Sequence, residues 1–232
     1  MKILGIIPAR GGSKGVKKKN IKHLGNKPLL VYTIEVAEAS ALTDVIVSTD
    51  DEEIAKVAKE YGGKVPFLRP EELATDNAKA IPVIQHALVE AEKLYGKEYD
   101  AVMMLQPTTP FKIVEDINNA IAIMQNSNCD SVISVVDVEG HHPARMKFIE
   151  DDRLIDPPYC EAYENQPRQE LEPMYIRNGA VYLTRKEILM NDSFKGEDSR
   201  ALIMPNIRSV NIDTELEFKY AEWILKEKLI NA

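Results

Sequence analysis

The part of the sequence best suited to chemistry is a glycine-rich, cationic stretch close to its start. Residues 9–20 read ARGGSKGVKKKN and directly follow an almost wholly apolar run, residues 2–7. Glycines let backbone N–H groups approach a phosphate closely, and Arg10, Lys14 and Lys19 provide cations that can meet a triphosphate. Open α/β sheets bind ligands at the carboxyl ends of their strands. Position and chemistry together therefore predict a phosphate-binding loop.

Two familiar phosphate-binding motifs do not describe this loop. The sequence contains no G-x-x-x-x-G-K-[ST] string, which a Walker A loop requires. Gly11, Gly12 and Gly15 have the wrong spacing for the dinucleotide fingerprint G-x-G-x-x-G, and the loop is too basic for it. The remaining alternative is a solvated turn with a lysine run, a description that suits Lys17 and Lys18.

The elements that must position this loop alternate between strand and helix signals. Buried strands are expected at residues 2–7, 45–47, 101–105 and 131–136. One helix is expected to begin near Pro28 and a second after a cap at Asp50 and Asp51. Two more helices are expected at residues 78–95 and 113–126. A run of βα units implies a mostly parallel sheet with right-handed crossovers. The expected fold class is therefore α/β.

The second half of the chain is less regular. Further strands are expected at residues 65–68 (an edge strand, because of its proline), 180–183, 202–204 and 210–212. The last helix begins around Thr214, and its expected apolar face consists of Leu216, Tyr220, Trp223 and Ile224. Residues 139–173 show no helical period. A loop this long inside a compact domain usually carries function or a partner contact.

Composition narrows the classes of function. The 232 residues fit one domain, 1–232, with room for a modest insertion. The formal net charge of −8 disfavours a general nucleic-acid binder, although a local basic pocket can still bind an anionic small substrate. No stretch approaches the apolar length of a membrane span, so we expect no membrane partner and a cytoplasmic protein. The separated Cys129 and Cys160 suit free thiols better than a disulfide.

The cationic loop and six further blocks resemble the CMP-sialic acid synthetases, the acylneuraminate cytidylyltransferases. The first block is IPARGGSKG at residues 7–15, with Lys19 and Asn20 behind it. The others follow in family order: STDD at 48–51, RPEELA at 69–74, LQPTTP at 105–110, QPRQ at 166–169, NGAVY at 178–182 and NIDTE at 211–215. The resemblance implies a Rossmann-like, mostly parallel sheet of the nucleotide-diphospho-sugar transferase type.

The resemblance implies that CTP lies over the loop after the first strand. The expected phosphate contacts are Arg10, Ser13, Lys14 and Lys19, and the expected further nucleotide contacts are Ala9, Gly12, Asn20 and Arg69. Arg10, Lys14 and Lys19 are also the candidate catalytic cations. The alternative for Arg69 is a surface arginine in a salt bridge.

The resemblance also implies a site for a sugar acid. Gln106 follows a buried strand and is expected to hydrogen-bond the sugar's hydroxyl or N-acyl groups; alternatively, it satisfies backbone groups. Arg145 and Arg168 are candidates for the sugar carboxylate, because a guanidinium matches that group bidentately. The alternative for both is rim charge on a loop. Asn178 and Tyr182 are candidates for the pocket lining, although a tyrosine on a strand is more often core.

Family members hold magnesium with two aspartates two residues apart, and these positions are Asn211 and Asp213 here. Residues i and i+2 on a strand project to the same face, so both side chains can reach one ion. Asparagine offers a neutral carbonyl oxygen, which is a weaker ligand than a carboxylate. We therefore expect Mg²⁺ (or Mn²⁺) to bind through these two residues, water and the phosphates, without a two-aspartate cage. Asp213 is also a candidate catalytic residue.

The sequence thus predicts a cytidylyltransferase that joins CMP from CTP to the anomeric hydroxyl of a nine-carbon α-keto sugar acid, N-acetylneuraminic or legionaminic acid, and releases pyrophosphate. Residues 66–70, 143–147 and 175–179 look more like legionaminic than sialic acid synthetases. Residues 139–173 resemble the family's dimerisation arm, which completes the neighbouring sugar site in a homodimer. The alternatives are a cytidylyltransferase for another sugar acid or a polyol phosphate, and a non-catalytic sugar-nucleotide binding protein, which Asn211 would favour.

Overall fold

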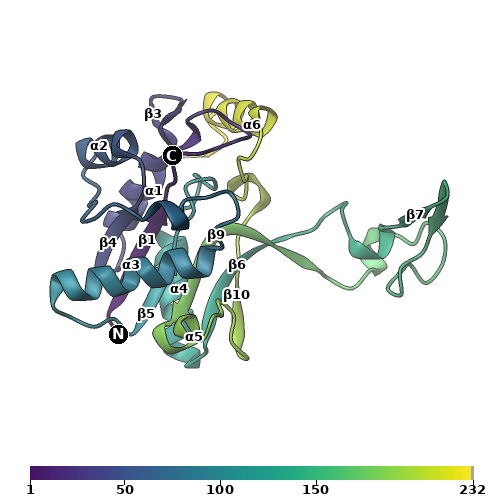
Figure 1. Ribbon diagram of the computed structural model, residues 1–232. Coiled ribbons are helices and arrows are strands. Elements are labelled where there is room, and N and C mark those ends of the chain that lie inside the picture. The colour runs from purple at the N-terminus through teal and green to yellow at the C-terminus, as the bar shows by residue number, and fades with distance from the viewer. Residues whose placement is uncertain (231–232) are drawn as a thin grey trace.

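The computed structural model describes residues 1–230 and centres on one six-stranded sheet (Figure 1). Its spatial order is β10 (Ser199–Ile203), β6 (Ser131–Asp137), β9 (Tyr175–Arg185), β5 (Ala101–Met104), β1 (Ile3–Pro8) and β4 (Asp44–Ser48). Strand β1 runs parallel to β4 and β5, and β10 runs parallel to β6. Strand β9 is antiparallel to both of its neighbours, β5 and β6. The predicted Rossmann-like α/β fold with a mostly parallel sheet is confirmed.

Helices cover both faces of the sheet. They are α1 (Leu29–Glu38), α2 (Glu52–Glu60), α3 (Ala80–Tyr95), α4 (Val114–Ser127), α5 (Lys186–Met190) and α6 (Glu215–Lys226). Helices α1, α2 and α4 share a core with Ile3 and Ile7 of β1, whereas α3 and α5 share another with Leu4 and Ile6. Alternate side chains of β1 therefore enter opposite cores, which explains why this strand is apolar throughout. No helix of residues 1–230 has the length and apolar character to cross a membrane.

Helix α6 packs over the loop that follows β1. That loop leads into a 3₁₀ turn (Lys19–Ile21) and a small hairpin, β2 (His23–Leu24) with β3 (Lys27–Pro28). A third core joins Val16 and Leu24 of this region to the buried face of α6. The beginning and the end of the chain therefore meet at the carboxyl end of β1.

An extended arm leaves the body between β6 and β9 and projects far from the sheet (Figure 1). It comprises the segment 139–173, which was expected to be irregular, and contains a two-stranded hairpin, β7 (Phe148–Glu150) with β8 (Arg153–Ile155). Ile149 and Leu154 on this hairpin expose 74% and 71% of their surface. The arm therefore presents apolar side chains that its own chain does not cover.

Two predicted strands are wrong. Residues 65–68 contribute only an isolated bridge from Leu68 to Thr49, and residues 210–212 form a loop. Residues 64–69 lie beside β4, where the N–H of Val47 donates to the Lys64 carbonyl at 2.8 Å and the N–H of Arg69 donates to the Thr49 carbonyl at 2.7 Å, but Pro66 lacks the N–H that a continuous ladder needs. The N–H of Ile212 instead donates to the carbonyl of Thr108 at 2.8 Å, which ties the two loops together.

The predicted apolar face of α6 is also wrong in part. Leu216, Tyr220 and Trp223 are exposed, and Tyr220 stacks on Trp223 with ring centroids 5.9 Å apart. The buried face consists of Phe218, Ala221 and Ile224, of which only the last was predicted. The stripes formed by these two sets both have helical spacing, so the periodicity alone could not identify the one that packs.

Candidate active site

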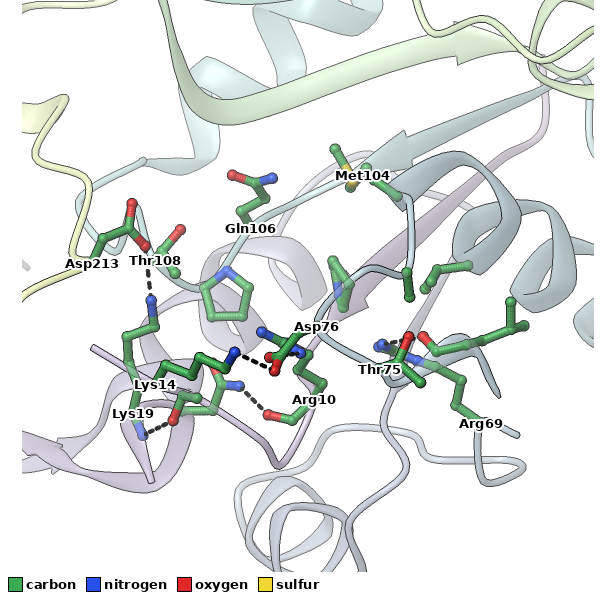
Figure 2. Close-up of a pocket in the computed structure, with 18 of the residues that line it drawn as sticks. Arg10, Lys14, Lys19, Arg69, Thr75, Asp76, Met104, Gln106, Thr108 and Asp213 are labelled. Atoms are coloured by element: carbon green, nitrogen blue, oxygen red, sulfur yellow. Dashed lines mark hydrogen bonds and ion pairs between the residues drawn. The ribbon is translucent and has the colours of Figure 1, made fainter. Parts of the chain in front are cut away.

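A cleft of about 580 Å³ opens at the carboxyl ends of β1 and β5 (Figure 2). Its walls include the loop after β1, residues from 69 to 80, the turn after β5, and the segment 211–213. The predicted site residues that line it are Arg10, Ser13, Lys14, Lys19, Asn20, Arg69, Gln106, Asn211 and Asp213. The fold thus brings the predicted nucleotide and metal residues into one cleft.

Side-chain oxygens hold the loop after β1 in shape. The Asp50 carboxylate accepts the N–H of Gly11 at 3.1 Å. The Ser13 hydroxyl accepts the N–H of Lys19 at 3.0 Å and donates to a carbonyl within the loop at 2.7 Å. Asp50 was expected to cap α2 together with Asp51, but Asp51 alone accepts the N–H groups of the first turn. Asp50 instead orders the loop after β1.

This loop rests directly on the segment that precedes α6. A Cβ atom on Gly15 would lie 1.9 Å from the carbonyl oxygen of Asp213, so only glycine fits there. The Lys19 ammonium donates to the Ile212 carbonyl at 2.8 Å and to the Asp213 carboxylate at 2.9 Å. A predicted phosphate-binding cation and a predicted metal ligand are therefore in direct contact (Figure 2).

Arg10 and Lys14 share one carboxylate, that of Asp76 (Figure 2). The Arg10 guanidinium lies 2.9 Å from one carboxylate oxygen, and the Lys14 ammonium lies 2.6 Å from the other. A hydrogen bond from Lys14, which has the larger effect, and one from Arg10 hold the pKa of Asp76 below its usual range. Asp76 was not among the predicted site residues, although its place two positions beyond the RPEELA block is a signal that could have identified it.

Arg69 is buried, with 5% of its surface exposed, and so the alternative of a surface salt bridge is wrong. Its guanidinium donates to the Ser48 hydroxyl at 3.1 Å and also to the Ser48 carbonyl. Burial lowers the pKa of Arg69, and the nearby Asp50 charge opposes that effect. The end of β4 therefore fixes this cation on the wall of the cleft.

Asn211 and Asp213 face each other, although no strand carries them. The Asn211 amide nitrogen donates to the Asp213 carboxylate at 2.6 Å, and rotating the amide would present its oxygen instead. No cluster of three or more His, Cys, Asp or Glu residues within 1–230 could hold a metal. Magnesium commonly takes one or two carboxylates and completes its shell with water and phosphate. The pair therefore fits an ion shared with a nucleotide and does not fit a closed protein cage.

A smaller hollow of about 320 Å³ adjoins the cleft and shares Gln106 and Asn211 with it. Asn178 and Tyr182 also line this hollow, so the structure brings three predicted sugar residues together. Asn178 is buried and accepts the hydroxyl of Ser134 at 2.6 Å. Its amide therefore also joins β9 to β6.

Four predicted site residues line neither the cleft nor the adjoining hollow of their own chain. Arg145 and Arg168 lie on the arm, where the Arg145 guanidinium pairs with Glu161 at 2.9 Å and Arg168 begins a 3₁₀ turn. Ala9 is buried in the core beneath the loop. Gly12 is exposed, and a Cβ atom there would meet nothing within 4 Å. The roles predicted for these four residues, like those predicted for the other site residues, stay predictions.

Replacing Gly15 by alanine should force the phosphate loop away from the segment 211–213, because the clash is with backbone and no side-chain rotation relieves it. We expect a lower melting temperature and at least a roughly tenfold weaker CTP affinity, or about 1.4 kcal/mol. Gly12→Ala is the matched control for melting temperature, since its site is open. Calorimetry and thermal unfolding measure both effects. Equal melting temperatures and equal CTP affinities for Gly15→Ala and the wild type would contradict the contact.

Sequence comparison finds relatives over nearly the whole chain. The family described as "Cytidylyltransferase" matches residues 4–195. The "Post-translational flagellin modification protein B" of Campylobacter coli is 33% identical over 99% of this chain and 97% of that protein. The "CMP-N,N'-diacetyllegionaminic acid synthase" of Legionella pneumophila is 36% identical over 99% of this chain and 97% of that protein. The "N-acylneuraminate cytidylyltransferase" of Escherichia coli O18:K1:H7 is 37% identical over 98% of this chain, which spans 53% of that protein.

Structural comparison agrees on the fold. A CMP:2-keto-3-deoxy-manno-octonic acid synthetase complexed with CTP aligns with a TM-score of 0.73, over 98% of this chain and 100% of that one, at 17% identity. At that identity the likeness shows the fold alone. The family match covers most of the sequence, and several relatives exceed 30% identity over nearly all of it. The chain belongs to the cytidylyltransferase family.

Proposed function

We propose that the protein transfers CMP from CTP to the anomeric hydroxyl of a nine-carbon α-keto sugar acid in the cytoplasm and releases pyrophosphate. The observation that carries this proposal is the convergence of Arg10, Lys14 and Lys19 on one cleft that also contains Gln106 and Asp213. Cations suited to a triphosphate thus lie beside polar groups suited to a sugar and a metal. The names of the relatives, which include CMP-legionaminic acid synthases and a pseudaminic acid cytidylyltransferase, support the same reaction.

The proposed chemistry requires positioning and charge stabilisation more than covalent participation. The anomeric hydroxyl oxygen forms a bond to the α-phosphorus while the bond from that phosphorus to the bridging oxygen breaks. Pyrophosphate leaves with the bonding electrons, and the hydroxyl proton passes to water or to the Asp213 carboxylate. Arg10 and Lys14 stabilise the phosphate charge once the triphosphate has replaced Asp76, and Lys19 does so from the side of Asp213.

Asp213 and Asn211 are the residues that would hold Mg²⁺ or Mn²⁺ against the nucleotide. When bound, such an ion polarises phosphate oxygens and neutralises developing charge. The protein offers only one negative charge at this pair, because Asn211 is neutral. Lys19 approaches the same carboxylate, at 2.9 Å, and so further reduces its charge. Affinity for the ion should therefore depend strongly on the phosphates of the nucleotide.

The hollow beside Gln106 is the proposed site of the sugar acid. A glutamine amide both donates and accepts hydrogen bonds, which suits a sugar's N-acyl group and hydroxyls. Asn178 and Tyr182 border the same hollow. Together with the legionaminic-like residues 143–147 and 175–179, these features favour an N-acylated acid of the legionaminic type.

A second copy of the chain would complete this site. The arm projects away from the sheet of its own chain (Figure 1). It contains Arg145 and Arg168, neither of which lines the cleft. It also exposes Ile149 and Leu154, and exposed apolar patches commonly mark interaction surfaces. We therefore propose a homodimer in which each arm packs on the other copy and brings a guanidinium to the sugar carboxylate. Arg168 is the favoured donor because it stands in the QPRQ block.

A pyrophosphate-release assay with CTP and a panel of nonulosonic acids tests the reaction directly. We expect pyrophosphate and CMP-sugar in equal amounts with an N-acylated nine-carbon acid. Arg10→Ala should lower turnover roughly 10²- to 10³-fold without a change in melting temperature, because its partners are a solvent-exposed carboxylate and one carbonyl. If pyrophosphate were released only with a polyol phosphate as acceptor, the substrate would be a polyol phosphate and not a sugar acid. CTP binding without release for any acceptor would favour the non-catalytic alternative.

Magnesium titrations of two variants test the metal pair. Asp213→Ala removes the one carboxylate and should lower turnover roughly 10²-fold while raising the magnesium concentration needed for half-maximal rate. Asn211→Asp adds a second carboxylate and should lower that concentration. An unchanged titration curve for Asp213→Ala would show that this carboxylate does not hold the ion.

Charge placed on the hairpin of the arm tests the dimer. The double variant Ile149→Asp, Leu154→Asp should be monomeric by light scattering, because a buried interface does not accept unpaired charges. It should keep its CTP affinity and lose turnover of the sugar acid. Glu150→Gln in the same hairpin is the matched control and should stay dimeric. A monomeric wild-type protein with full activity would contradict the assignment of the arm.

A further inference from the structure

Lys112 is an unusual residue for the interior of this protein. It lies between the turn after β5 and the start of α4, with 2% of its surface exposed, and is the only lysine in the buried core of residues 1–230. Burying an ammonium group is costly unless its donors are satisfied. A lysine kept in such a place therefore needs a structural or chemical reason, and the proposed chemistry above does not use it.

All three N–H groups of this ammonium are used. They donate to the Thr33 hydroxyl of α1 at 3.0 Å and to the carbonyls of Gln106 and Thr109 at 2.9 and 2.6 Å. The three acceptors are neutral. The nearest acid that acts on it, Asp116, is already engaged as an ion pair with Arg208. Burial lowers the pKa of Lys112 to about 7, and the charge of Asp116 opposes this effect.

The two carbonyls belong to the turn that forms one wall of the cleft. Gln106 and Thr108 line the cleft from this turn. The Thr108 carbonyl accepts the N–H of Ile212 at 2.8 Å, which anchors the segment containing Asp213. The Thr109 hydroxyl donates to the Asn178 carbonyl at 3.1 Å. One turn therefore connects the proposed sugar residues with the proposed metal residue.

We propose that Lys112 is a positioning residue for the transfer reaction, whose buried ammonium clamps the 106–109 turn against α1 and so sets Gln106 and the segment 211–213 in place. The inference rests on the function proposed above. A methionine of similar length would fill the space but leave the carbonyls of Gln106 and Thr109 without donors. The turn would then have to rearrange to find water, and Gln106 would move with it.

Steady-state kinetics of Lys112→Met and Lys112→Arg test the proposal. Lys112→Met should lower kcat/KM for the sugar acid roughly 10²-fold, as expected for a displacement of about 1 Å. Its affinity for CTP, measured by calorimetry, should fall less than that of Gly15→Ala, because the turn reaches Lys19 only through the hydrogen bond from Ile212 to Thr108, whereas Gly15 lies directly against Asp213. Lys112→Arg retains cationic donors and should recover much of the lost kcat/KM.

The matched control is Met124→Ala, a fully buried core change in the last turn of α4. It should lower the melting temperature yet leave the KM for the sugar acid unchanged. If Lys112→Met does not fold, Lys112→Gln, which keeps two N–H donors, takes its place in the same comparison. The inference would be overturned if Lys112→Met, or Lys112→Gln in its place, kept the wild-type kcat/KM for the sugar acid. It would also be overturned if Met124→Ala lost as much kcat/KM as the Lys112 variant. A wild-type protein inactive with every acid would instead defeat the proposed function itself.

Discussion

The site depends on the close contact between the loop after β1 and the segment before α6. The side chains of Lys19 and Asp213 are 194 residues apart in the sequence, yet they meet at 2.9 Å, and Gly15 lies against the Asp213 backbone. The parallel strands of a Rossmann-like sheet place the first loop at one edge. The packing of α6 then returns the end of the chain to that edge. The residues predicted to bind phosphate and those predicted to bind metal therefore share one cleft.

The cleft is rich in cations, although the protein as a whole is acidic. The net charge is −8, but three cations and the buried Arg69 border the cleft. Asp76 neutralises Arg10 and Lys14 in the structure. Both pairs are largely solvent-exposed, and so each contributes little to stability. A triphosphate, which carries several negative charges, is well suited to replace a single carboxylate there. Asp76 therefore keeps Arg10 and Lys14 in position, and breaking these two ion pairs costs little free energy.

Much of this architecture could be predicted because strands and helices largely alternate from β1 to β6 and because the loop after β1 has a distinctive composition. The failures have physical causes. Residues 65–68 lie beside β4, but Pro66 interrupts the hydrogen-bonded ladder, and residues 210–212 instead hydrogen-bond to the loop at Thr108. The packed stripe of α6 depends on tertiary contacts that the helical period does not encode. The pair of Asp76 with Arg10 and the hydrogen bond of Lys112 to Thr33 join residues 66 and 79 positions apart, so only the fold shows these partners. Local sequence patterns likewise do not show how far the arm extends from the sheet.

A crystal structure of the protein with CTP and magnesium, without a sugar acid, would test triphosphate binding most directly. We expect the triphosphate to lie on the loop of residues 10–19, to contact Arg10, Lys14 and Lys19, and to separate Asp76 from Arg10 and Lys14. The base would lie toward Arg69. A nucleotide bound elsewhere, with the Asp76 pairs intact, would show that the loop after β1 does not bind the triphosphate.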